Sequence, residues 1–520
     1  MNLKKQSGRT TIGVPGGREL VFLWAAGLAG LLLSIVLFFT SAPGAHITAQ
    51  VDQDQAREIA VAYLEQLGIS GVEGMTSIET MSTQSAHFLY LDDLYDSWEE
   101  IEQGQQTLAL GNWAFRWEDA GLVDPVGVAD QYRVTVDFNG RVVLVRHSGM
   151  EDGPEAHPDR ARALDLSGRA LAAAGLNRSA WQLEDYSAHT SDERTDSLLT
   201  YAEVLEAEDA IPRKITVTLH GGTLEAFQVK PGLPDRYSQV VERHGRQEAL
   251  LRGLPQSLAV FLLLLVFSAV FLRRYHQGEL GVNRGLRLFL VYFVLYSAVT
   301  VSILPVIHAS TNVTVLNMAQ SKLFMSVFMF AFLTFGASLL VFVSYSVGES
   351  YAREGWAGVL QAVDGLFARR IFTRSFGWSV HTGFLCGAAL LGLTSTVHWI
   401  SYSLRGYRIP HGFGHWSASW PLLVGLLGPL STAIFAETCI RLPILALGRS
   451  LFSRRPGRGL FLGALVSSLV YGAFCEFPAP DHIFLAMGLF FVLGLLLCGI
   501  LIRYGLMAAF WATFFGTALA

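Results

Sequence analysis

Cysteine is scarce in this chain and is absent from its polar part. The four cysteines among 520 residues all lie in apolar segments: Cys386, Cys439, Cys475 and Cys498. A disulfide framework is therefore excluded for the polar region, which needs a hydrophobic core of its own. The sequence also lacks a Gly-rich phosphate loop between a strand and a helix, and a recognisable Ser/His/Asp arrangement. It gives no sign of nucleotide binding or of serine-hydrolase chemistry.

Charged residues are few and unevenly distributed. They make up 16% of the chain, whereas hydrophobic residues make up 51%, so part of the protein must lie in lipid. Residues 46–252 contain 35 acidic residues against 17 basic residues, a net charge of −18, and the remainder is basic. An acidic region between basic, apolar flanks argues against nucleic acid as a partner.

Long uncharged runs predict a polytopic all-α membrane bundle with about nine spans. The first span, residues 20–41, follows several basic residues, which places residues 1–19 in the cytoplasm. Its apolar run is longer than a usual signal-peptide core, so we favour an uncleaved anchor over a cleaved signal peptide ending near "SAPGA". A second transmembrane helix is predicted at 254–274, and the other spans fall within a multispan domain at 280–520.

Arginine clusters alternate with arginine-poor loops, as the positive-inside rule requires. They lie at 273–287, 353–374, 449–458 and at Arg503, so we expect these loops to be cytoplasmic. Residues 42–253 then lie outside the cytoplasmic membrane, which we take to be bacterial. The stretch "YAREGWAGVLQAVDGLFARRIFTR" has apolar residues at helical spacing beside basic ones, and predicts a helix on the cytoplasmic membrane surface.

The outer region, residues 42–253, is predicted to be α+β and to contain two similar units. The first, about 46–150, opens with the helical pattern "QAREIAVAYLEQLGIS" and closes with "YRVTVDFNGRVVLVRH", in which "NG" marks a hairpin. The second, about 158–235, opens with "ARALDLSGRALAAAGLN" and closes with "KITVTLHGGTLEAFQV". Each unit would bury one sheet face under one helix. The pattern resembles PepSY-like modules, which occur beside secreted and membrane proteases.

An acid and a base interrupt the apolar segment "STAIFAETCIRLPILALG" at 431–448. Glu437 and Arg441 are four residues apart, with the acid on the N-terminal side, which is the favourable order for a helical ion pair. A charge inside a bilayer needs such a partner. We interpret the pair first as one that holds the bundle together. A remaining catalytic role for Glu437 is the second interpretation, and binding of a charged ligand is the third.

The segments from Trp416 onward resemble the CPBP family, which includes CAAX-prenyl endopeptidases and bacteriocin-processing proteins. The stretches "AETCIR" (436–441), "YGAFC" (471–475) and "RYGLMAAFWATFFGTAL" (from Arg503) fall where that family has E-E-x-x-x-R, F-x-x-x-H and H-x-x-x-[ND]. The resemblance covers roughly residues 280–520. It implies an intramembrane metalloendopeptidase that cleaves a peptide bond in or near the membrane with a metal-bound water.

Most catalytic positions of that family are replaced in this chain. The family's first Glu falls on Ala436, which can neither bind a metal nor take a proton. The first His falls on Cys475, whose thiolate could still bind zinc. The second His and the Asn or Asp fall near Phe514 and Ala518, and residues 504–520 contain no His, Asp, Glu or Asn.

Two main hypotheses follow from these replacements. An active enzyme would use Glu437 and Arg441 as catalytic residues and Cys475 as a ligand of zinc or another divalent metal. A pseudoprotease would instead use the bundle as a scaffold, with the acidic outer region holding or sensing a peptide or membrane-protein partner. The lost positions favour the pseudoprotease. A transporter-like role is a third hypothesis, weakened because the spans show no inverted repeat.

Histidines and acids elsewhere are weaker candidates for a metal site. His411 and His415 are four residues apart in "HGFGHW", but the glycines and a preceding proline favour an ordinary loop. His381 and His398 lie in an apolar segment, where a buried, hydrogen-bonded histidine is the commoner finding. A short predicted outer turn, "CEFPAPDH", offers an alternative cluster of metal ligands: Cys475, Glu476, Asp481 and His482.

Overall fold

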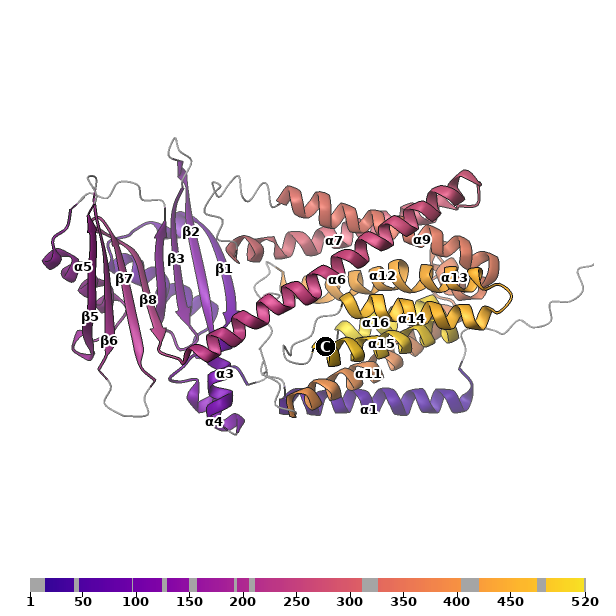
Figure 1. The fold of residues 1–520 in the computed structure, drawn as a ribbon, viewed down its shortest axis with the longest axis horizontal. Coiled ribbons are helices and arrows are strands. Elements are labelled where there is room, and N and C mark those ends of the chain that lie inside the picture. The colour runs from indigo at the N-terminus through magenta and orange to yellow at the C-terminus, as the bar shows by residue number, and fades with distance from the viewer. Residues whose placement is uncertain are drawn as a thin grey trace, which may run out of the picture.

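The computed structural model describes ten segments of the chain: 15–41, 46–95, 97–123, 129–148, 157–190, 194–204, 211–310, 326–403, 420–474 and 483–518. These segments form a helical bundle and a separate region built on an antiparallel sheet, which lie at opposite ends of the molecule (Figure 1). We call residues 46–234 the sheet domain. The coarse prediction, a polytopic helical membrane region plus a polar region containing a sheet, agrees with this architecture.

One eight-stranded antiparallel sheet organises the sheet domain, in the order β1-β2-β3-β4-β8-β7-β6-β5. The strands are β1 (Thr76–Thr83), β2 (Gly111–Val123), β3 (Ala129–Asp137), β4 (Val142–Ser148), β5 (Trp181–Thr190), β6 (Thr195–Glu203), β7 (Arg213–His220) and β8 (Thr223–Pro231). The two halves meet at β4 and β8, where Val145 pairs with Phe227. A helix precedes each half: α2 (Gln53–Gln66) and α5 (Arg160–Ala173).

Local sequence signals explain where these elements begin and turn. Asp52 caps α2 by accepting a 2.8 Å hydrogen bond from the backbone N–H of Gln55, whose side chain caps in return, and Asp159 caps α5 in the same position. The "NG" and "GG" hairpins are confirmed. Gly140 and Gly221 adopt φ of +82° and +56° between their paired strands, a region that glycine enters without steric cost.

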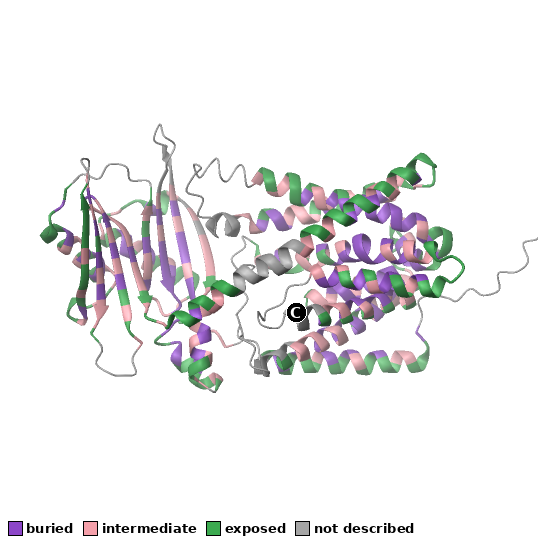
Figure 2. Cartoon of the chain, viewed as in Figure 1, coloured by how far each residue is buried: buried purple, intermediate pink, exposed green. Residues whose placement is uncertain are grey.

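A single hydrophobic core joins α2 and α5 to one face of the sheet. Trp117 and Phe227 are fully buried in it, together with Tyr63 of α2 and Ala170 of α5. The Tyr63 hydroxyl donates a 3.4 Å hydrogen bond to the Ala170 carbonyl, which ties the two helices directly. Figure 2 shows buried and partly exposed residues alternating along the strands, as expected for a sheet with one covered face.

A continuous helix, α6 (Asp235–His276), joins the sheet domain to the bundle (Figure 1). Its 42 residues extend about 63 Å at the usual helical rise. At its start Tyr237 donates a 2.5 Å hydrogen bond to Asp93 of α3 (Ser85–Leu94), next to the short helix α4 (Trp98–Gly104).

Within the described residues, the bundle contains seven helical segments that are long and apolar enough to span a membrane: Gly17–Phe38, Pro255–His276, Val282–Leu304, Ser326–Gly355, Arg374–Val397, Pro421–Leu451 and Pro456–Phe474. Besides α6, its described helices include α1 (Gly17–Ser41), α7 (Val282–Ser310), the π-helical η4 (Met329–Thr334), α9 (Phe335–Gly355), α11 (Arg374–Ser403), α12 (Pro421–Phe435), α13 (Leu442–Leu451), α14 (Pro456–Phe474), α15 (Ile483–Tyr504) and α16 (Leu506–Ala518).

The predicted number of nine spans remains a prediction. With 22 residues, α15 has the length of a span, but α16 has 13 residues and extends about 20 Å, less than a hydrocarbon core of about 30 Å. Gly505, with φ of +92°, separates the two helices, so the apolar sequence that continues past Arg503 turns sharply instead of running on.

Helix α1 packs tightly against α11 through glycine. A Cβ atom built on Gly30 would lie 2.4 Å from the carbonyl oxygen of Ala388, and one built on Gly392 would lie 2.4 Å from Cα of Gly30. Such close approach of two backbones is typical of membrane helix pairs. Residues 17–41 therefore form part of the bundle, although retention of this segment as an uncleaved anchor remains a prediction.

The loops that carry the arginine clusters lie at the end of the bundle that is remote from the sheet domain (Figure 1). Arg284 and Arg353 share two acids there. Their guanidinium nitrogens lie 2.9 and 2.7 Å from a Glu349 oxygen, and each lies 2.5 Å from Asp364. Loops that are separate in sequence thus lie on one side of the bundle, which is what the positive-inside argument requires.

The predicted membrane-surface helix after α9 forms only in part, and its position at a membrane surface remains a prediction. The chain there forms a 3₁₀ turn, η5 (Ala357–Leu360), and a short helix, α10 (Gln361–Phe367). Trp356, Leu360 and Val363 are buried in a cluster with residues of α13 and α16. The first part of the apolar stripe therefore packs on protein, whereas Ile371 at its end is exposed.

Candidate site around Glu437 and Arg441

The candidate site lies on a π-helical stretch between α12 and α13. This stretch, η7 (Ala436–Arg441), continues both helices but has one residue more per hydrogen-bonded turn. Pro443 follows within α13 and cannot donate the bond that an α-helix would make to the carbonyl of Cys439. π-helical turns often occur at functional sites because they redirect side chains.

Glu437 and Arg441 form the predicted ion pair, and both side chains are completely buried. The pair extends to a second helix, because the Thr513 hydroxyl on α16 donates a 2.7 Å hydrogen bond to Oε1 of Glu437. Arg441 Nη1 also lies 3.3 Å from the Thr513 oxygen. The Arg441 guanidinium further lies 4.3 Å from the ring centroid of Tyr471 on α14, at cation–π distance. The charged pair therefore connects three parts of the bundle.

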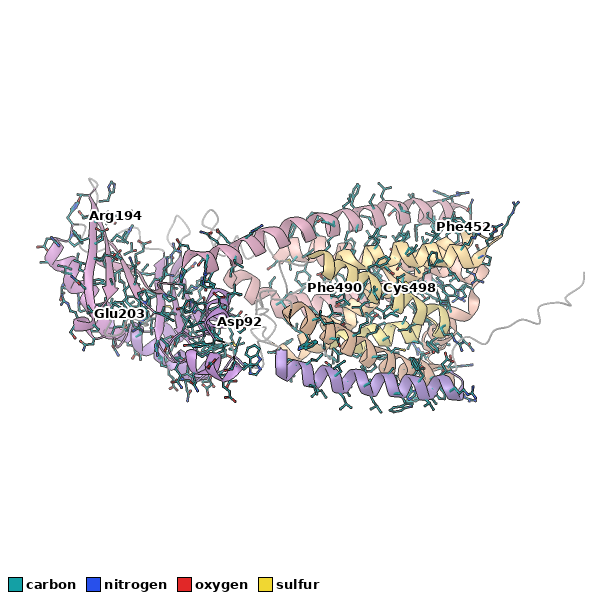
Figure 3. All side chains as sticks on the ribbon, turned by 60° about the horizontal axis from the view of Figure 1, so that its bottom comes forward. Asp92, Arg194, Glu203, Phe452, Phe490 and Cys498 are labelled. Carbon is teal, nitrogen blue, oxygen red and sulfur yellow. The ribbon has the colours of Figure 1, made fainter. Side chains whose placement is uncertain are left out.

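Part of this buried polar layer has no hydrogen-bond partner among the described residues. These atoms include Oε2 of Glu437 and the hydroxyls of Ser467 and Ser468 on α14. The thiol of Cys498 on α15 lies beside the two serines. Figure 3 shows Cys498 among the C-terminal helices of the bundle. One carboxylate oxygen of Glu437 is thus free of protein donors in the described part of the chain.

The residues at the family's other motif positions lie in different surroundings. Ala436 is buried in an apolar cluster that includes Leu385, Cys386 and Ala512. Phe514 is buried and packs edge-on against Trp511. The backbone of Ala518 closes α16, and Cys475 falls outside the described residues, directly after the last residue of α14.

The weaker metal candidates do not assemble within the described residues. His381 on α11 packs between Trp24 and Trp378, with ring centroids 5.3 and 5.5 Å away. His398 lies in the same helix, although its side chain is outside the described set. Across the described segments, no group of three or more His, Cys, Asp and Glu side chains could hold a metal ion. The remaining candidates lie outside the described residues: His411, His415, Glu476, Asp481 and His482.

Comparison with models of protein families, with curated proteins and with solved structures finds no match to this chain. The resemblance to the CPBP family therefore stands on its motif residues alone.

Sequence reasoning missed Thr513 as a member of the site. The signal was present, because Thr513 and Thr517 are the two hydroxyl residues of the apolar helix α16. Which of them faces Glu437 depends on the rotation of α16. Thr517 bonds to carbonyls of its own helix, whereas Thr513 bonds to the carboxylate. The position of Cys498 beside Ser467 and Ser468 likewise depends on how α15 packs against α14.

Proposed function

We propose that this chain is a CPBP-like integral membrane protein that acts as a catalytically inactive pseudoprotease. The bundle would serve as a binding or sensing scaffold in a bacterial cytoplasmic membrane. The outer sheet domain, formed by two PepSY-like units, would hold a peptide or a membrane-protein partner. In both halves of the sheet a helix comes before four strands, with α3 and α4 inserted after the first strand of the first half, and this order supports the two-unit interpretation.

The convergence of the three motif segments supports the CPBP-like assignment. In sequence the second begins 30 residues after the end of the first, and the third begins 28 residues after the end of the second, yet Arg441 of the first contacts Tyr471 of the second. Glu437 of the first contacts Thr513, the neighbour of the position at which the third motif would have its His. Residues at motif positions meet in this way when they surround a common site, whether that site is active or has lost its activity.

The inactive assignment rests on one observation: the hydrogen bonds and the burial of Oε1 of Glu437. That oxygen accepts hydrogen bonds from both Arg441 and Thr513 and is fully buried. A general base must be able to take a proton from an attacking water. A carboxylate oxygen that is already held by a guanidinium and a hydroxyl is occupied, so it is poorly placed to bind and orient an attacking water. The carboxylate that would assist it, the family's first Glu, is Ala436.

The alternative is the family's activity, metal-dependent endopeptidase cleavage. One observation favours it: the second carboxylate oxygen of Glu437 lacks a donor among the described residues. That oxygen could serve a zinc or another divalent ion if Cys475 lay close enough to share it. We rank this second because the two other family positions, near Phe514 and Ala518, supply no ligand atoms.

The decisive experiment measures metal content by elemental mass spectrometry. The full chain would be purified in detergent and freed of loosely bound metal. We expect no stoichiometric metal and no cleavage of added peptides. About one tightly held zinc per chain, lost in both Glu437→Gln and Cys475→Ala but kept in Cys386→Ala, would overturn the proposal and restore the endopeptidase. Cys386 is the matched control, because it is a buried cysteine outside the ion-pair network.

A further inference from the structure

Three arginines face one another across neighbouring strands of the sheet domain. Arg116 on β2 pairs directly with Arg133 on β3, and Arg133 pairs directly with Arg146 on β4. Like charges placed opposite each other destabilise a sheet. The register brings these residues together in a sheet domain whose sequence is strongly acidic overall. We call the three residues the arginine ladder.

The ladder lies on the sheet face opposite α2 and α5. Its strand neighbours Phe115, Tyr132, Val134 and Val145 point into the hydrophobic core, so the alternating arginines point the other way. Arg116 and Arg133 are half-buried and Arg146 is exposed. Further along the same face, β8 and β7 contribute mainly small and uncharged residues opposite one another: Ala226, Gln228, Thr216 and Thr218.

The arginine charges are only partly neutralised. Arg116 donates a 2.5 Å hydrogen bond to Gln131 and lies near the charge of Glu118. In the described part of the chain, Arg133 and Arg146 have no hydrogen bond or ion pair to a carboxylate. Burial and then the neighbouring Arg146 charge lower the pKa of Arg133 from its usual value. An anion placed between these guanidinium groups would remove the repulsion and gain charge-assisted hydrogen bonds.

We propose that the arginine ladder binds a peptide segment rich in carboxylates, laid across the open face of the sheet. Guanidinium groups form paired hydrogen bonds with carboxylates, so each acidic side chain can sit between two neighbouring arginines. Neighbouring strands are about 4.8 Å apart, so the ladder spans about 10 Å. Side chains on one face of an extended peptide are about 6.8 Å apart. Two acidic residues at alternate positions therefore fit within the ladder.

The orientation of the sheet favours a peptide over the membrane surface itself. Strand β1 is nearest the bundle and contacts α7, and the other strands follow outward from it (Figure 1). Arg116, Arg133 and Arg146 therefore lie at increasing distance from the bundle. A flat layer of lipid headgroups could reach the nearest arginine but not all three. A chain that leaves the membrane and runs outward along the sheet could reach each in turn.

This inference rests on the proposed function in one respect, namely that the bound peptide belongs to a partner protein. The binding itself involves none of the bundle residues. The test uses the full chain in nanodiscs of zwitterionic lipid. Fluorescence anisotropy follows a short labelled peptide with glutamate at alternate positions, compared with the same peptide carrying glutamine. The variants are Arg133→Gln and Arg169→Gln. Arg169 is the matched control, an exposed arginine of α5 on the covered side of the sheet.

We expect the wild type to bind the glutamate peptide with an affinity that falls as salt is added, and to show no measurable binding of the glutamine peptide. Arg133→Gln should weaken binding about tenfold, whereas Arg169→Gln should change it little. Arg133→Gln should unfold no more easily than the wild type, since it removes a like-charge contact. Equal binding by the two variants, no binding by the wild type, or marked destabilisation by Arg133→Gln would each overturn the proposal.

The membrane is tested as a competing source of anions. If soluble glycerol 3-phosphate, a phospholipid headgroup, binds through Arg133 more tightly than the peptide, the ladder serves lipid and the proposal is wrong. The inactive assignment and the ladder proposal also fail separately. Tightly bound zinc at Glu437 would refute the inactive assignment and leave the ladder result unchanged. Equal peptide binding by both arginine variants would refute the ladder and leave the metal result unchanged.

Discussion

Removing one partner of the Glu437–Arg441 pair should destabilise the protein strongly, and removing both should not. Both side chains are fully buried, so Glu437→Gln leaves an uncompensated guanidinium in the bundle. Loss of one member of a buried pair costs about 3–5 kcal/mol, whereas replacing both by well-packed neutral groups is often neutral or stabilising. Glutamine can still accept the Thr513 hydrogen bond, so we expect the lower end, about 3 kcal/mol, for Glu437→Gln.

The assay is a double-mutant cycle with Glu437→Gln, Arg441→Met and the double variant. The free energy of unfolding would be measured in mixed micelles by tryptophan fluorescence. Each single variant should be destabilised, and the double variant should recover at least about half of the summed loss. The matched control is the exposed pair Glu19–Arg503, whose side chains are 28% and 52% exposed and 2.9 Å apart. Breaking that pair with Glu19→Gln should cost less than about 1 kcal/mol.

Two results would refute this reasoning. Additive single effects would mean that the charges do not stabilise each other in the folded bundle. A Glu437→Gln variant as stable as the Glu19→Gln control would mean that water or an ion reaches the pair. The second result would also weaken the inactive assignment, because a hydrated Glu437 could take part in hydrolysis.

Two further predictions concern helix contacts in the bundle. Thr513→Val removes the hydroxyl that binds the buried carboxylate and should cost about 1–3 kcal/mol, whereas Thr517→Val, which loses only bonds to its own helix, should cost less in the same unfolding assay. Gly392→Ala places a methyl group against the backbone of Gly30 and should lower the free energy of unfolding. It should also reduce disulfide cross-linking between cysteines introduced into α1 and α11. Gly377→Ala in the same helix meets open space and should be neutral or stabilising by about 1 kcal/mol; equal effects of the two alanines would contradict this packing.

Much of the local structure could be predicted from the sequence. The uncharged runs gave the apolar helices, because a bilayer requires a minimum length of apolar residues. The dipeptides at Gly140 and Gly221 gave the hairpins, since they supply the backbone conformations that tight turns need. The four-residue spacing of Glu437 and Arg441 gave the ion pair. Each of these signals acts between residues close together in the chain.

Tertiary structure alone decided the contacts between distant segments. The Thr513 hydroxyl reaches Glu437 because of the rotation of α16, which an almost uniformly apolar helix does not encode in its pattern. Trp356 and Leu360 are buried against protein, although their spacing fits a lipid-facing stripe equally well, because lipid and a protein core are alike in polarity. The arginine ladder depends on the register of three strands, and a shift of one residue would move an arginine to the other sheet face.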